Sequence, residues 1–303
     1  MHVAIGLLRL GYKVASIDLD ARQGTLTRYM ANRFEYIARH KVELPSPNHL
    51  PIEKSRASTL KEQEDEGRNF LLMALEELRS GHDFIVIDTP GSDTYLSRLA
   101  HSYADTLITP MNDSFVDLDV IARINPATKE IISPSIYTRM VEEQKAVHKN
   151  RDGQDQDMVW IVMRNRLSHL DAHNKREVGE MLDQLGRQYG FRLAPGFSER
   201  VIFRELFLKG LTLLDLKEDA QKDLTMSELA ARQEIRQLLR VINPEAIRGY
   251  PRHRKSTIWK TRLFCSGQPA LGMAKPWYDF FSQTHPQSRI SSRWSGHPFS
   301  ARH

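Results

Sequence analysis

The stretch DFIVIDTPG, at residues 83–91, gives the clearest indication of the fold. Its apolar residues, Phe84 to Ile87, do not alternate with polar ones, which is typical of a strand covered on both faces of a parallel sheet. Asp88 follows at the end of that strand, and Gly91 comes three residues later. A carboxylate in this place is the Walker B arrangement: it helps to hold Mg²⁺, while the glycine lets the backbone approach a terminal phosphate. We therefore expect Asp88 in a metal site and Gly91 beside a nucleotide.

Three further stretches show the same apolar runs ending in polar turn residues. They are VASIDLD at 14–20, DTLITPMND at 105–113 and MVWIVMRNR at 158–166. Helical patterns lie between and after them, at residues 25–41, 59–81, 135–147, 170–191 and from Thr225 to before Pro244. Residues 1–10 fit a buried helix, whereas the three-proline stretch 43–55 and the polar stretch 148–157 fit surface connections. Strands that alternate with helices predict a doubly wound α/β fold with a mainly parallel sheet of P-loop NTPase type.

Two carboxylates end the strand at 14–20. Ligands of open α/β sheets bind beyond the carboxyl ends of the strands, so Asp18 and Asp20 can face a phosphate through Mg²⁺ or a water molecule. The alternative, which the sequence leaves open, is that an aspartate here only caps the next helix. Asn165 and Arg166 follow the strand at 158–166, where the amide of the asparagine can contact an adenine edge.

The phosphate loop G-x-x-x-x-G-K-[ST] is absent, because none of the 16 glycines is followed by lysine. We expect the chain to begin partway through the helix that follows this loop, and so to lack the first strand. The place of a central strand would then be empty and its neighbours' backbone groups unpaired, at about 1 kcal/mol for each lost hydrogen bond. That cost favours a start assigned to an internal methionine, or a broken reading frame, over a true truncation.

The composition permits one large domain or two smaller ones, with 303 residues of which 40% are hydrophobic. A single cysteine, Cys265, excludes a disulfide framework and indicates a cytoplasmic protein. No apolar run approaches the roughly 18 residues of a membrane span, which indicates no membrane partner.

Charge divides the chain into two parts. From Arg248 onward ten Lys or Arg residues face the single acid Asp279, although the whole chain carries only +5. We therefore separate a nucleotide-binding α/β domain at residues 1–243 from a basic tail at residues 244–303. The tail is either a disordered extension or translated frame error, or an arm for DNA or another anionic surface. Within the domain, Lys175, Arg176 and Arg187 are possible DNA contacts, although acids on the same helix favour a solvated face.

Several strings resemble one known group, the deviant Walker A ATPases of the ParA and MinD superfamily, and within it the MipZ family of division-plane positioning ATPases. They are GYKVASIDLDARQ, DFIVIDTPG, ADTLITPMNDSFVDLD, VWIVMRNRL and RVIFRELFLKGLTLLDL, and together they span roughly residues 2–240. The strings PMNDSFVDLD and RELFLKGLTLLDL are the most specific to the family. The family's loop K-G-G-x-G-K-[ST], which would precede Met1, is the main departure.

The resemblance implies roles for the site residues. Asp20 would position the attacking water, Asp18 and Asp88 would help to hold Mg²⁺, and Asn165 would touch the adenine. Gly91 and the segment PMNDSF would lie near the dimer face. ATP would drive a homodimer that binds chromosomal DNA nonspecifically and inhibits FtsZ assembly, and ParB would set up its gradient. The protein would then be cytoplasmic and nucleoid-associated.

Two other readings remain open. Without the loop, the chain is a nonenzymatic remnant that keeps only partner binding. A MinD-like membrane switch would need a C-terminal amphipathic helix with a basic face, but Glu228 and Glu234 temper the charge of the last helix, which we interpret as a packing helix.

Overall fold

The computed structural model describes residues 1–20, 23–112, 114–151, 157–167, 172–216, 224–242 and 261–266. They belong to one compact unit, Met1–Pro269. Its helices are α1 (His2–Arg9), α2 (Thr25–His40), α3 (Leu60–Arg79), α4 (Tyr95–Ser102), α5 (Phe115–Leu118), α6 (Ile136–Asn150), α7 (Ala172–Tyr189), α8 (Val201–Leu208) and α9 (Met226–Ile242). Its strands are β1 (Val14–Asp18), β2 (Asn48–Pro51), β3 (Phe84–Thr89), β4 (Thr106–Asn112), β5 (Ala122–Ile124), β6 (Ile131–Pro134), β7 (Val159–Asn165), β8 (Phe191–Ala194) and β9 (Thr261–Ser266).

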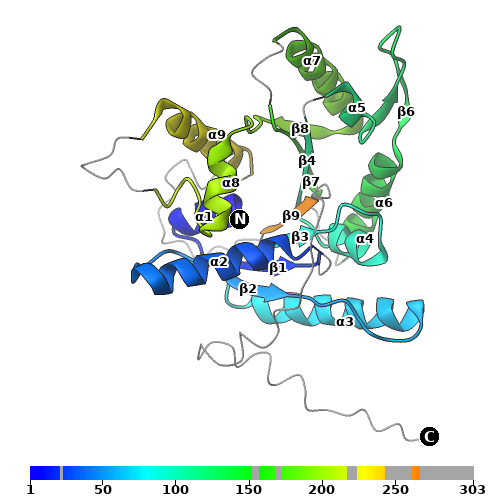
Figure 1. Cartoon of the computed structure of the whole chain (residues 1–303). Helices are drawn as coiled ribbons and strands as arrows, with labels where there is room; N and C mark the ends of the chain where they lie inside the picture. Colours follow the sequence, from blue (N-terminus) through cyan, green and yellow to red (C-terminus); the bar gives the residue numbers. More distant parts are fainter. Residues whose placement is uncertain are drawn as a thin grey trace, which may run out of the picture. The chain divides into compact units, whose positions relative to one another are not determined.

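Seven of these strands form one parallel sheet in the order β2-β1-β3-β9-β4-β7-β8, while β5 and β6 form a small antiparallel hairpin (Figure 1). All four strands expected from apolar runs are present as β1, β3, β4 and β7. The predicted doubly wound, mainly parallel α/β fold is confirmed.

The apolar runs do not alternate because each strand packs on two different cores. Along β3, Ile85 and Ile87 face a core that includes α3, α4, α6 and α7, whereas Phe84 and Val86 face a core with α1, α8 and α9. Both cores are apolar, so both faces of the strand require hydrophobic side chains. Because the strands of the sheet are parallel, their polar carboxyl ends lie along one edge.

Strand β9 lies at the centre of the sheet. Its backbone pairs with β3, where Asp88 is opposite Cys265, and with β4, where Ile108 is opposite the same residue. The expectation of an empty central place with unpaired neighbours is therefore wrong. The sequence analysis places residues 261–266 in the tail, because the sequence from Arg248 onward shows no helical or strand periodicity. The division at residue 243 otherwise stays a prediction, since it falls outside the described residues.

Other elements also differ from the sequence expectation. The stretch 43–55 is more than a surface connection, because β2 lies inside it and pairs with β1. The expected loop at 148–157 begins later, since α6 continues to Asn150. The sequence analysis does not predict helix α8, strand β8 or the β5–β6 hairpin. The hairpin and β2 are short and half-exposed, so they carry little of the hydrophobic pattern that reveals a strand.

Helix α9 is a packing helix, as the sequence indicated. Thr225 and Glu228 form the expected capping box, each side chain accepting from the other residue's backbone N–H. Its apolar face is buried in the core around α1, at Ala231, Ile235, Leu238, Leu239 and Ile242. A Cβ on Gly6 of α1 would meet the side chain of Leu239, so glycine lets the two helices pack closely. This contact leaves the apolar face of α9 unavailable to a lipid surface.

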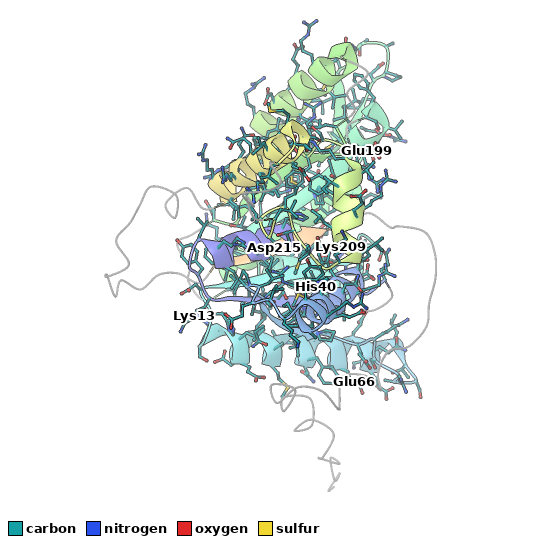
Figure 2. The ribbon with its side chains drawn as sticks, turned by 60° about the vertical axis from the view of Figure 1, so that its left-hand side comes forward. Lys13, His40, Glu66, Glu199, Lys209 and Asp215 are labelled. Carbon is teal, nitrogen blue, oxygen red and sulfur yellow. The ribbon has the colours of Figure 1, made fainter. Side chains whose placement is uncertain are left out.

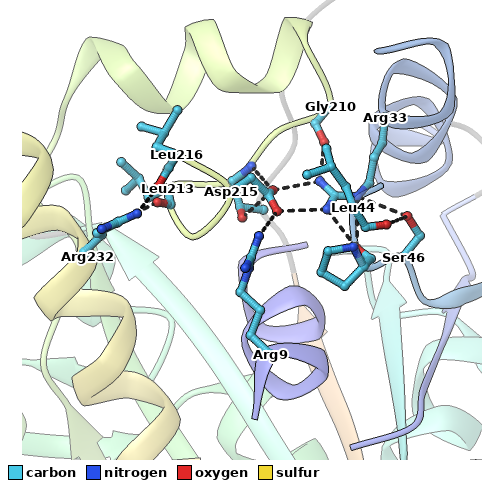
Figure 3. Close-up of polar contacts among 11 residues, drawn as sticks. Arg9, Arg33, Leu44, Ser46, Gly210, Leu213, Asp215, Leu216 and Arg232 are labelled. Carbon is cyan, nitrogen blue, oxygen red and sulfur yellow. Dashed lines mark hydrogen bonds and ion pairs between the residues drawn. The ribbon is translucent and has the colours of Figure 1, made fainter. Parts of the chain in front are cut away.

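A buried ion pair fixes the segment after α8, at residues 209–216. Asp215 accepts hydrogen bonds from both Arg33 of α2 and Arg9 of α1 (Figure 3). In Figure 2, Asp215 lies beside α1, whose Arg9 donates to it, and Lys209 lies at the end of α8. A cavity of about 470 Å³ adjoins this pair, lined by Arg9, Glu43, Leu44, Pro45, Leu214, Asp215, Leu216 and Arg232. The string RELFLKGLTLLDL thus docks onto the first two helices.

Candidate functional site

Asp18 and Asp88 come together at the ends of neighbouring parallel strands. They are register partners across β1 and β3, and the backbone oxygen of Asp88 accepts from Leu19 at 2.8 Å. Register partners on parallel strands project to the same face, about 4.8 Å apart. Asp18 is 1% exposed and Asp88 is half-buried. The two carboxylates that the sequence assigned to a metal site therefore share one place at the carboxyl edge of the sheet.

The crowding of these acids changes the protonation of Asp88. Its pKa rises to about 7, first because the group is buried and second because the charge of Asp18 is close. Asp20 adds a smaller contribution in the same direction, while the amino terminus of the chain opposes it. A carboxylate pair that holds a proton near neutral pH is a place where a cation would be stabilised, because the cation offsets the repulsion that raises this pKa.

Three hydrogen bonds hold the Asp18 carboxylate. Its Oδ2 accepts from the backbone N–H of Thr27 at 2.9 Å and from the Thr27 hydroxyl at 2.8 Å. Its Oδ1 accepts from the backbone N–H of Asp20 at 3.0 Å. Helix α2 starts at Thr25, and its N-cap, Gly24, makes no side-chain capping bond. Asp18 therefore caps this helix from the end of the preceding strand.

Asp20 lies in the turn between β1 and α2. Its Oδ1 accepts from the N–H of Gln23 at 3.2 Å, and its backbone oxygen accepts from the N–H groups of Gln23 and Gly24. These bonds close the turn before α2, whereas the helix cap that the sequence left open as an alternative is made by Asp18. Asp20 is half-exposed and close enough to Asp88 to affect its pKa, so turn capping does not remove it from the site.

Asn165 and Arg166 lie farther along the same edge. Asn165 ends β7 as the register partner of Asn112, and its Oδ1 accepts from the N–H of Arg166 at 3.0 Å. Three strand steps separate β3 from β7, which corresponds to about 14 Å at the usual spacing. Gly91 is exposed in the segment directly after β3. The structure thus brings Asp18, Asp20 and Asp88 together and places Asn165 on the same side of the sheet.

The possible DNA contacts lie on α7. Arg176 is exposed, with its Nε 3.8 Å from Oε1 of Glu180, and Arg187 is also exposed. The side chain of Lys175 lies outside the described residues. The Arg176–Glu180 pair agrees with a solvated helix face, so DNA binding by these residues stays a prediction.

Sequence reasoning missed Thr27 and His49. The ring of His49, on β2, contacts the Thr27 hydroxyl through Nε2 at 3.1 Å and the Ser16 hydroxyl through Nδ1 at 2.9 Å. Burial, and then the amino terminus, lower the pKa of His49 to about 4. No sequence signal could have found these residues, because their contact depends on β2 pairing with β1.

The oxygen atoms at the ends of β1 and β3 suit Mg²⁺. Protein sites often bind Mg²⁺ through one or two carboxylates together with substrate phosphates. In the described parts of the chain, no group of three or more His, Cys, Asp or Glu side chains is arranged to hold a metal. Asp18 and Asp88 thus fit a magnesium site that a phosphate completes, and do not fit an all-protein metal centre.

No helix among the residues that the structure describes combines the length and apolar character needed to cross a membrane. No curated protein matches the chain. Among solved structures, a putative plasmid partition protein of Borrelia burgdorferi B31, bound to AMPPNP, is 15% identical with a TM-score of 0.46 and covers 79% of this chain and 91% of its own. The MinD cell division protein of Aquifex aeolicus is also 15% identical, with a TM-score of 0.45, and covers 83% of this chain and 92% of its own.

A family model settles the relationship that the sequence strings suggested. The model described as ATPase MipZ matches residues 1–245, which is most of the 303-residue chain. The chain therefore belongs to the MipZ family of ATPases.

Proposed function

We propose that this protein is an ATP-dependent positional switch that sets the place of the cell-division (FtsZ) ring relative to the chromosome. The observation that carries the proposal is the pair of adjacent carboxylates, Asp18 and Asp88, at the ends of β1 and β3 in a chain of the MipZ family. ATP binding with Mg²⁺ would drive dimerisation, and slow hydrolysis would return the monomer. FtsZ, ParB and nonspecific chromosomal DNA are its proposed partners, in a cytoplasmic, nucleoid-associated protein.

Each residue of the site has a proposed task. Asp18 and Asp88 hold the magnesium environment, and Asp20 orients the attacking water from the turn after β1. Asn165, with Arg166 beside it, contacts the adenine at the other end of the nucleotide, and Gly91 lets the backbone approach the terminal phosphate. Mg²⁺, when bound, neutralises phosphate charge.

A dimer face is supported by the segment after β4. Phe115 and Val116 are 37% and 81% exposed in the short helix α5, which begins at the last residue of the string PMNDSF. Ser114 holds the start of this helix by accepting from the N–H of Asp117 at 3.2 Å. Two apolar side chains presented at the carboxyl edge of the sheet, where the nucleotide would bind, suit an interface that forms only with nucleotide.

The Asp20→Ala substitution tests the switch. It belongs in a chain extended by any in-frame upstream codons for the glycine-lysine loop, with Asp65→Ala on the exposed side of α3 as the matched control. We expect Asp20→Ala to form dimers with ATP but to release phosphate roughly 100-fold more slowly, since positioned proton-transfer or water-orienting groups contribute about this much. Unchanged phosphate release would contradict the role of Asp20.

A second candidate function has one specific observation in its favour. β1 already pairs on both sides, with β2 and β3, so a strand leading into α1 would belong on the far side of β3. β9 occupies that place. With β9 there, the sheet is closed without a phosphate-loop strand, and the chain would act as a nonenzymatic module that only binds partners.

Direct binding measurements on the present chain separate the two functions. The nonenzymatic module binds ParB or FtsZ with an affinity that ATP and Mg²⁺ do not change, and it binds no ATP in a calorimetric titration. The switch requires nucleotide-dependent binding. A folded chain that binds neither protein would contradict the second candidate.

A further inference from the structure

A line of polar side chains runs from the Asp18 carboxylate into the sheet. The Thr27 hydroxyl lies 2.8 Å from Asp18 Oδ2, His49 Nε2 lies 3.1 Å from that hydroxyl, and His49 Nδ1 lies 2.9 Å from the Ser16 hydroxyl. Ser16 is fully buried in the middle of β1. Thr27, His49 and Ser16 come from three elements, α2, β2 and β1. None of these three residues has a task in the function proposed above.

The direction of each hydrogen bond in this line follows from chemistry. An ionised Asp18 can only accept, so the single hydroxyl proton of Thr27 is given to it. The Thr27 oxygen must then accept from His49, which places the ring proton on Nε2. A neutral ring with its proton on Nε2 leaves Nδ1 as an acceptor, and the Ser16 hydroxyl donates to it. The lowered pKa of His49 agrees with a neutral ring.

We propose that Ser16, His49 and Thr27 are positioning residues that lock the Asp18 carboxylate in one orientation through this one-way line of hydrogen bonds. That this orientation favours metal binding rests on the proposed function, whereas the fixed orientation of the Asp18 carboxylate does not. An ionised carboxylate has about four acceptor sites. The N–H and hydroxyl of Thr27 and the N–H of Asp20 fill three of them, so one remains for a cation.

The ring of His49 gives the first test. In the full chain with ¹⁵N-labelled histidine, the His49 signals are identified by their loss in His49→Phe. We expect a neutral ring protonated on Nε2 in the wild type and in Thr27→Ser, which keeps the hydroxyl. Thr27→Val removes the acceptor and should shift the Nε2 signal. A ring protonated on Nδ1, or the same spectrum in Thr27→Val as in the wild type, would overturn the line of hydrogen bonds.

The backbone N–H of residue 27 gives a second test that needs no metal. It lies in the first turn of α2, where N–H groups have no partner within the helix, so its protection from hydrogen exchange reports the bond to Asp18. We expect roughly tenfold faster exchange at this amide in His49→Phe than in the wild type. His49→Gln, whose amide can still donate to Thr27, should restore most of the protection. Equal exchange rates at this amide in wild type and His49→Phe would show that the line of hydrogen bonds does not hold the Asp18 carboxylate.

Binding of Mn²⁺, followed by electron paramagnetic resonance, separates this inference from the proposed function. Outer-shell substitutions typically weaken metal affinity about 10-fold to 100-fold, and we expect this loss in Thr27→Val with recovery in Thr27→Ser. Equal Mn²⁺ affinity in wild type and Thr27→Val would overturn positioning for metal binding. A wild-type chain that binds no Mn²⁺ but shows the expected ring and amide signals would support the lock and contradict the proposed metal site.

Discussion

Replacing Asp215 with asparagine should destabilise the protein severely. The side chains of Asp215 and Arg33 both have no solvent exposure, and Arg33 reaches the two carboxylate oxygens at 2.8 and 3.0 Å. Arg9 and the N–H and hydroxyl of Thr212 donate to the same carboxylate. Asp215→Asn keeps the shape but directs an NH₂ group at these donors and leaves the Arg33 charge buried without its partner. Breaking a buried pair in this way costs about 3 to 5 kcal/mol.

The pKa of Asp215 supplies an independent magnitude. Despite burial, the hydrogen bonds and charge of Arg33, with help from Arg9 and Thr212, lower this pKa from 3.8 to about 2. The shift corresponds to about 2 kcal/mol of stability at neutral pH. Because the folded pKa is the lower one, this stability is fully present above about pH 4 and is lost as the pH falls through about 2. Roughly half of it should remain at about pH 3.

Urea denaturation at about pH 7 and about pH 3 measures both quantities. The matched control is Asp65→Asn on the exposed side of α3, for which we expect a change within about 0.5 kcal/mol. Asp215→Asn should cost several times more at neutral pH, and its cost should shrink at about pH 3. A loss below about 1 kcal/mol at neutral pH, or one that grows on acidification, would refute the reasoning from the buried pair.

Three further predictions concern Gly210 in the loop after α8, the central strand β9 and the Asp88 carboxylate. Gly210→Ala should lower the melting temperature by several degrees, because Gly210 has a φ of +64° and a Cβ would overlap the backbone of Arg33. Calorimetry measures the melting temperature. An unchanged value would show that α2 and the loop after α8 can move apart. Phe264→Pro in β9 should cost about 3 kcal/mol or more, since proline removes a ladder donor at the centre of the sheet, whereas Phe264→Ala, which keeps this N–H, should cost less. Equal denaturation midpoints for the two variants would remove β9 from the sheet. Asp88→Asn should be more stable than the wild type at about pH 8. Because the pKa of Asp88 is higher in the folded than in the unfolded protein, the wild type should lose stability as the pH rises from about 4 to 7, and Asp88→Asn should not. If Asp88→Asn lost as much stability over this range, another group would be responsible.

Local sequence patterns predicted four of the seven strands of the sheet and the acids at two of their ends. The runs at β1, β3, β4 and β7 are apolar without alternation because each strand is covered on both faces, and this is a local property that can be read without the fold. Asp18 and Asp88 could be assigned to one site on the same grounds, since neighbouring parallel strands bring their carboxyl ends to one edge. The capping box of Thr225 and Glu228 was equally local.

Features that depend on partners far away in the chain could not be predicted from local patterns. β9 has no pattern of its own that distinguishes it, and it becomes a strand through the backbone groups that β3 and β4 present to it. His49 reaches Thr27 and Ser16 only because β2, which follows Pro47 and ends at Pro51, pairs with β1. The pairing of Asp215 with Arg33 joins positions 182 residues apart. Hydrophobic periodicity reports whether a segment is covered, whereas the identity of the covering segment is set by long-range pairing and packing.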